Sequence, residues 1–146
     1  MTGAFAWALA VGAALSVQVG LNMILRAHLG HAAWAALVNF GVGTLALAAF
    51  ALAVRAPLPS GASVAQVPWW ALAGGALGAL YVASSTVLGP RLGVALLTAL
   101  VVAGQMLAAL VIDHYGWLGF QQHPITFTRL AGAALIVAGV VLLGRT

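Results

Sequence analysis

Long hydrophobic runs, separated by short polar segments, dominate this chain. A helix needs about 20 apolar residues to cross the ~30 Å hydrocarbon core of a membrane. Five stretches meet or approach this length, and strand-like alternation is not seen. The pattern predicts an all-α integral membrane protein, one membrane domain over residues 1–146. Its five transmembrane helices are expected at about 4–25, 32–54, 69–88, 92–112 and 129–144.

The polar breaks between these runs predict the connections. Residues 55–68 contain three prolines, a glycine and serines, which favour a loop. Residues 113–128 are too polar to cross a membrane and rich in aromatics, so we expect a second loop at the interface with water. The triplet Gly89-Pro90-Arg91 predicts a tight turn between the third and fourth spans.

Composition removes several classes of protein. Of the 146 residues, 64% are hydrophobic and only 4% are charged, whereas a soluble domain carries about a quarter charged residues. The net charge of +4 is spread along the chain, so no basic patch for nucleic acid is expected. The absence of cysteine excludes disulfides and thiolate metal sites, and no cofactor is predicted.

The arginines bear on orientation. With five spans the termini lie on opposite sides, here called A (N-terminal) and B. Side A receives Arg55 and Arg129 together with Asp113, and side B receives Arg26, Arg91 and Arg145. Orientation follows the excess of Lys and Arg on the cytoplasmic side, and this split is nearly even. It favours insertion in both orientations and an antiparallel homodimer; the alternative is one weakly fixed orientation with parallel protomers.

Polar side chains inside the spans are the candidate solute-binding residues. Gln18 and Asn22 are four residues apart and share a helix face. At 1.5 Å per residue, Gln18 and Tyr81 lie about 12 Å from the B ends of their helices, and Gln105 lies about 10 Å from the A end of its own. An antiparallel pair would bring these groups level around a shared cavity. The predicted site comprises Gln18, Asn22, Trp34, Asn39, Tyr81 and Gln105. The alternative is that the amides only bond helix to helix.

Titratable groups are scarce. The one acidic residue, Asp113, is expected at the A end of the fourth span, where it would either carry a coupling proton or pair with Arg129. The four histidines fall in connecting segments without metal-site spacing. No nucleophile–base pair or phosphate loop is evident, so an enzyme is not predicted.

Several blocks of sequence together resemble a known family. They are QVGLNMILRAHLG, AALVNFGVGTLAL, PWWALAGGALGALYV, GPRLGVALLTALVVAGQ, IDHYGWLG and TRLAGAALIVAGVVLL. In this order they resemble the YdcZ-like five-helix family of bacterial inner-membrane proteins, within the drug/metabolite transporter superfamily. The resemblance implies a half-size transporter, related to ten-helix proteins with two inverted halves. Four-helix relatives exchange cationic drugs for protons through a glutamate in the first helix, where this chain has Gln18 and Asn22.

The predicted function is therefore secondary transport across the bacterial inner membrane. A small polar or amphipathic solute would move by alternating access, with export as the expected direction. The expected partners are a second copy of the chain, membrane lipid and the solute. Two alternatives stay open: a non-transporting subunit that pairs with a related five-helix chain, and a channel.

Overall fold

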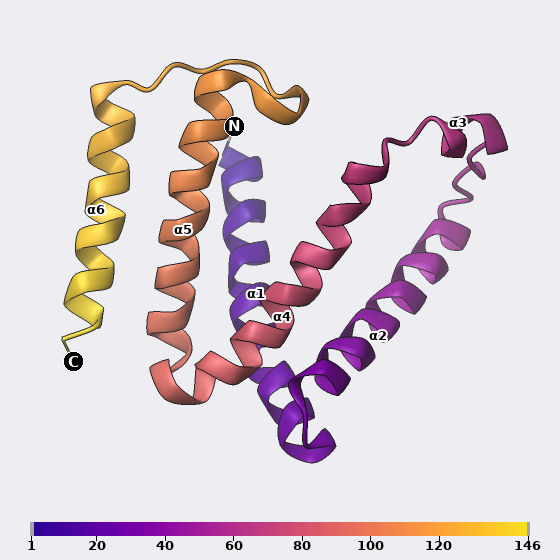
Figure 1. The fold of residues 1–146 in the computed structure, drawn as a ribbon, viewed down its shortest axis with the longest axis horizontal. Helices are drawn as coiled ribbons and strands as arrows, with labels where there is room; N and C mark the ends of the chain where they lie inside the picture. The colour runs from indigo at the N-terminus through magenta and orange to yellow at the C-terminus, as the bar shows by residue number, and fades with distance from the viewer. Residues whose placement is uncertain (1, 146) are drawn as a thin grey trace. The chain divides into compact units, whose positions relative to one another are not determined.

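The computed structural model describes residues 2–145, and within them every regular element is a helix (Figure 1). The elements are α1 (Thr2–Leu29), α2 (Ala32–Ala53), α3 (Gly61–Ala65), the 3₁₀ helix η1 (Trp69–Leu72), α4 (Ala73–Leu92), α5 (Val94–Tyr115), the 3₁₀ helix η2 (Trp117–Gly119) and α6 (Phe127–Leu143). Among the described residues, four stretches are long and apolar enough to cross a membrane: Gly3–Leu29, Ala32–Ala53, Trp69–Leu92 and Val94–Tyr115. The predicted all-helical membrane protein is confirmed at this level.

The fifth predicted span corresponds to α6. This helix is apolar but has only 17 residues, so it extends about 25 Å at 1.5 Å per residue. That length is at the lower limit for a bilayer crossing. The count of five spans therefore stays a prediction, as does the dimer.

Contacts within the chain cluster in two compact units. Unit 1 is Met1–Pro90 and contains α1, α2, α3 and nearly all of α4. Unit 2 is Arg91–Thr146 and contains α5, η2 and α6. Each unit contains its own polar cluster: a groove in unit 1 and an ion pair in unit 2.

In unit 1, one stripe of α1 packs on α4. Met23 lies so close to Gly89 that a Cβ there would be 2.7 Å from the Met23 Sδ, and Arg26 bonds to the backbone of α4 at Thr86. Val19 and Asn22 continue this stripe one turn back along α1, and both are buried. The other buried residues of unit 1 are small or medium in size: Ala32, Ala35, Ala36, Val82, Ser85, Thr86 and Gly89. Small side chains permit this close approach of helices.

The predicted tight turn at Gly89-Pro90-Arg91 is wrong. These residues belong to α4, which continues to Leu92, and the helix is interrupted only at Gly93, whose φ of 75° suits a glycine. Pro90 has no N–H to donate to the Thr86 carbonyl four residues earlier. The Arg26 guanidinium of α1 donates to that carbonyl instead, at 2.6 Å. A bond from a neighbouring helix thus compensates the proline.

The first predicted loop also differs in detail. Residues 55–68 contain the short helix α3, which Ser60 begins by accepting a hydrogen bond from the Ser63 N–H at 3.1 Å. At the other end of α2, the helix begins after His31, whose ring nitrogen accepts from the Ala33 N–H at 3.1 Å. Helix α1 continues to Leu29, beyond the predicted end of the first span.

In unit 2, α5 and α6 lie side by side and antiparallel (Figure 1). Helix α5 ends at Tyr115 and is capped by Gly116, which adopts a left-handed φ of 63°. Thr126 begins α6 by accepting a hydrogen bond from the Arg129 N–H at 3.4 Å. The connection is therefore shorter at both ends than the predicted loop 113–128, because Asp113 is still helical and α6 starts at Phe127.

Candidate functional site

A mostly apolar groove that includes several polar side chains opens within unit 1 among α1, α2 and α4. Its volume is about 440 Å³. The lining residues are Leu15, Gln18, Asn39, Phe40, Val42, Gly43, Thr44, Leu47, Gly78, Tyr81 and Val82. The groove therefore brings together three residues of the predicted site: Gln18, Asn39 and Tyr81.

Two amides meet at this groove. Gln18 Nε2 of α1 donates to Asn39 Oδ1 of α2 at 3.4 Å, and the pair is partly buried. This bond holds one helix to the other, as the interhelical alternative predicts. Each amide also has a donor or acceptor beyond the bond they share. Gln18 and Asn39 can therefore hold the helices together and still bind a ligand in the groove.

The third polar group of the groove is free of protein partners within residues 2–145. Tyr81 of α4 is half-buried and lines the groove, and its hydroxyl makes no hydrogen bond to the described chain. A buried or half-buried tyrosine hydroxyl normally finds a partner. The described chain therefore leaves this hydroxyl available for hydrogen bonding at the groove.

One glycine sets the width of the groove. A Cβ at Gly78 would lie 3.2 Å from the tip of the Phe40 ring, and both residues line the groove. A Cβ added at Gly74, one turn earlier on α4, would meet nothing within 4 Å. The two glycines share a GxxxG spacing, but only Gly78 stands against another helix.

The structure places the other predicted residues elsewhere. Asn22 is only 2% exposed and is not among the residues lining the groove. Trp34 is 58% exposed and does not line the groove either. Gln105 is an exposed residue of α5 in unit 2. Their roles in solute binding stay predictions.

Sequence reasoning missed several groove residues on α2. One stripe of α2 begins beside Asn39 and runs through Phe40, Thr44 and Leu47, at steps of four and three residues. Helical neighbours three or four residues apart share a face, so this stripe is visible in the sequence once Asn39 is chosen. What the sequence lacks is any sign that the stripe faces α1 and α4 rather than lipid.

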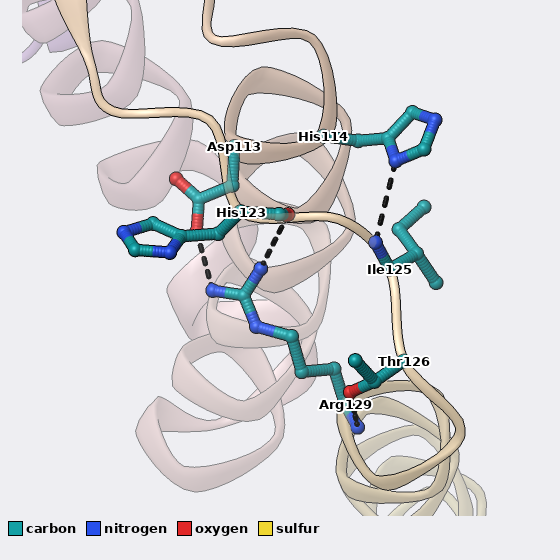
Figure 2. A network of polar contacts seen from close by, with 6 residues as sticks. All are labelled: Asp113, His114, His123, Ile125, Thr126 and Arg129. Carbon is teal, nitrogen blue, oxygen red and sulfur yellow. Dashed lines mark hydrogen bonds and ion pairs between the residues drawn. The ribbon is translucent and has the colours of Figure 1, made fainter.

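In unit 2 the polar groups form a different kind of cluster (Figure 2). Arg129 Nη2 lies 2.6 Å from Asp113 Oδ2, and its Nη1 donates to the His123 carbonyl at 3.0 Å. The side chains of Arg129 and Asp113 are 34% and 27% exposed. They border a pocket of about 270 Å³ between α5 and α6. Each charge is already paired, so a role for Asp113 in proton coupling stays a prediction.

Histidine and amide side chains complete this cluster. Figure 2 shows His114 turned toward the backbone of Ile125, whose N–H donates to His114 Nδ1 at 3.3 Å. Gln122 Nε2 donates to the His114 carbonyl at 2.9 Å. These bonds fasten the connection between α5 and α6. Within residues 2–145 no group of three or more His, Cys, Asp or Glu side chains is placed to hold a metal ion.

Fold and groove together define a multi-pass helical membrane protein. The chain belongs to the family described as "Putative inner membrane exporter, YdcZ", which matches residues 3–142. It is similar to inner membrane protein YdcZ of Escherichia coli (strain K12), with 29% identity over 140 residues that cover 96% of this chain and 93% of that protein. No solved structure matches the chain.

These comparisons confirm the family resemblance and the location in the inner membrane. An exporter is a transport protein rather than a class of enzyme, so the family description agrees with the coarser functional prediction. The details of solute, partner and mechanism are proposals.

Proposed function

We propose that this chain is a half-size transporter whose groove binds a small polar or amphipathic solute. One observation carries the proposal: Gln18, Asn39 and Tyr81 converge on a groove of about 440 Å³ inside a unit built from apolar helices. Polar groups at membrane depth are costly unless they face protein or water. A groove that keeps three of them at one place is best explained by a ligand or water that uses them.

The lining also indicates the class of solute. The lining residues within the described chain carry no charge. Two amides and a phenol offer donors and acceptors, and Phe40 offers an aromatic face. An uncharged polar molecule, or an amphipathic one with an aromatic part, fits this surface better than a cation, which would need a carboxylate for charge compensation.

A second copy in the opposite orientation would complete the site. The nearly even arginine split supports insertion in both orientations. Gln105 is exposed in the single chain, and by helix depth an antiparallel partner would carry its own Gln105 to the level of Gln18 and Tyr81. Two such copies would rock around the shared groove and expose it to each side in turn, as inverted-repeat transporters do. The family description supports export as the direction.

The two tyrosines of the chain provide a matched test. Purified protein is reconstituted in proteoliposomes and screened with a panel of uncharged polar and amphipathic solutes, and any solute with flux above empty liposomes is retained. Tyr81→Phe removes one hydroxyl and no packing, so flux at low solute concentration should fall about tenfold, the value of one hydrogen bond of about 1.4 kcal/mol. Tyr115→Phe, at an exposed residue stacked on Trp117, should leave flux unchanged. Equal flux in the two variants would remove the binding role of the groove.

Two further variants test the antiparallel arrangement. Gln18→Ala and Gln105→Ala should both reduce flux of the same solute. Tags on each terminus should label equally from both faces of the membrane. One-sided labelling would contradict the antiparallel homodimer. Absence of flux for the chain alone, restored by a related five-helix chain, would indicate a heterodimer subunit, and conduction without saturation would indicate a channel.

A further inference from the structure

A second pocket in unit 1 lies around Arg26 and is distinct from the groove. Its volume is about 330 Å³. It is lined by Met23, Arg26, Ala27, Gly30, Thr86 and Pro90, none of which lines the groove. Its chemistry also differs, because a guanidinium group stands in its wall.

Arg26 has a charge that the described chain does not balance. The only acidic side chain of the sequence is Asp113, which pairs with Arg129 in unit 2. The one hydrogen bond of the Arg26 side chain within residues 2–145 is the 2.6 Å bond to the neutral Thr86 carbonyl. A partly buried charge without a counter-ion is costly, even for Arg26, which lies in the last turn of α1 near the end of its apolar stretch.

The fold holds this guanidinium in place. Pro90 leaves the Thr86 carbonyl without its helical donor, and Arg26 Nη1 takes that position. This bond engages one edge of the guanidinium and leaves its other N–H donors available. A planar fork of donors suits the paired oxygens of a carboxylate or phosphate.

The pocket is also accessible. A Cβ built on Gly30 would meet nothing within 4 Å, so this wall of the pocket is open. By contrast, the guanidinium of Arg129 borders a pocket too, but Asp113 already neutralises it. Of these two arginine pockets, only the one at Arg26 presents a fixed positive charge without a counter-ion.

We propose that the Arg26 pocket binds an anionic group, a carboxylate or phosphate, which completes the charge balance of α1. Two sources have this chemistry: a soluble anion and the headgroup of a lipid with net negative charge, to which arginines near helix ends commonly extend. The site does not depend on the groove or on transport, so a failure of either proposal leaves the other to its own test.

The test measures thermal stabilisation of the full chain in lipid nanodiscs. One arm titrates inorganic phosphate in phosphatidylcholine nanodiscs. The other compares phosphatidylcholine nanodiscs with nanodiscs that contain one-third phosphatidylglycerol, without added phosphate. A bound anion should raise the melting temperature by about 3–6 °C at ten times its dissociation constant. A shift in the first arm assigns a soluble anion, and a shift in the second assigns a lipid headgroup.

Variants separate binding from folding. Arg26→Gln alone replaces the guanidinium that donates to the Thr86 carbonyl with a shorter amide side chain, so it can weaken this bond and destabilise the crossing of α1 and α4. Pro90→Ala supplies an N–H for that carbonyl, so the double variant R26Q/P90A should fold without the arginine. It should lose the shift, whereas Pro90→Ala alone should retain it. Arg145→Gln, an exposed position with the same change in charge, should also retain it. No shift in either arm for the wild type, or a shift retained in R26Q/P90A, would overturn the proposal.

Discussion

The two units of this chain treat their polar residues in opposite ways. In unit 1, Gln18, Asn39 and Tyr81 surround a groove, and the Tyr81 hydroxyl has no partner within residues 2–145. In unit 2, Asp113 and Arg129 bond to each other and to backbone at the end of the helix pair. The groove of unit 1 leaves hydrogen-bonding capacity available, whereas the Asp113–Arg129 pair of unit 2 uses its own. Elsewhere in unit 2, the buried Thr98 hydroxyl has no partner among the described residues.

This difference separates binding from fastening. A side chain that has used its donors and acceptors on the protein has little left for a ligand, while unpaired groups around a cavity retain that capacity. The uncharged groove of unit 1 is therefore the better candidate solute-binding site. The Asp113–Arg129 pair of unit 2 is the weaker candidate, although it contains the one acidic residue of the sequence. Substitutions at the groove and at the Asp113–Arg129 pair should accordingly affect different measurements: solute flux for the groove and stability for the ion pair.

The largest effect is expected from filling the groove. Gly78→Leu would place a side chain against Phe40, where even a Cβ comes within 3.2 Å of the ring. Flux of a transported solute in proteoliposomes should fall about a hundredfold, because the binding volume is lost rather than one hydrogen bond.

Gly74 provides the control for this variant. Gly74→Leu makes the same change one turn away, where an added Cβ would meet nothing within 4 Å. It should retain near wild-type flux. Equal loss in both variants would mean that the glycines act through helix packing in general and not through the groove.

A smaller effect, on stability, is expected from a glycine at the crossing of α1 and α4. Gly89→Ala would place a Cβ 2.7 Å from Met23 Sδ. The flexible Met23 side chain must shift to make room, which offsets the gain in helix propensity, so this variant should lose up to about 1 kcal/mol of unfolding free energy. At Gly139 of α6, an added Cβ would meet nothing within 4 Å. Gly139→Ala should instead gain about 0.5–1 kcal/mol, because alanine favours the helix.

Equilibrium unfolding in mixed micelles measures both substitutions. Losses of the same size would contradict the difference in packing between the two units. If Gly139→Ala alone were destabilising, the face of α6 at this position would be covered in the native assembly, which would favour a partner copy there.

The smallest effect is expected from the ion pair of unit 2. Because Asp113 and Arg129 are about a third exposed, a double-mutant cycle of Asp113→Asn and Arg129→Gln should give a coupling energy of about 0.2–1 kcal/mol. Added salt should reduce it. Solute flux should keep its dependence on pH in Asp113→Asn. A changed pH dependence would contradict a purely fastening role and support proton coupling.

Much of the fold could be predicted because lipid imposes one dominant constraint. Apolar runs of about 20 residues must be helical in a bilayer, so hydropathy alone predicts the long helices of the chain. The error at Gly89-Pro90-Arg91 has a specific cause. Proline was expected to end the helix, but a donor from another helix, Arg26, compensates it, and sequence pattern carries no such tertiary information.

The site was predictable only in part. The spacing of Gln18, Asn39 and Tyr81 within their spans identified polar positions at depth, and the structure brings these three to one groove. Asn22 shares a helix face with Gln18 but is buried and does not line the groove. Helical periodicity gives the face of a helix, not what that face meets. Gln105 lies in unit 2, and its place at the site depends on the proposed antiparallel partner.

The most direct test of the central claim is whether water fills the groove of unit 1 in the membrane. The native chain has no cysteine, so single-cysteine variants can be compared directly in sealed vesicles. One variant is Thr44→Cys, on the groove, and the other is Leu45→Cys, an exposed neighbour on α2. A membrane-impermeant maleimide reacts with the thiolate, which does not form in hydrocarbon. The account predicts labelling of Thr44→Cys and none of Leu45→Cys, with protection of Thr44→Cys by a transported solute. Absence of labelling at Thr44→Cys from both faces of the membrane would contradict it.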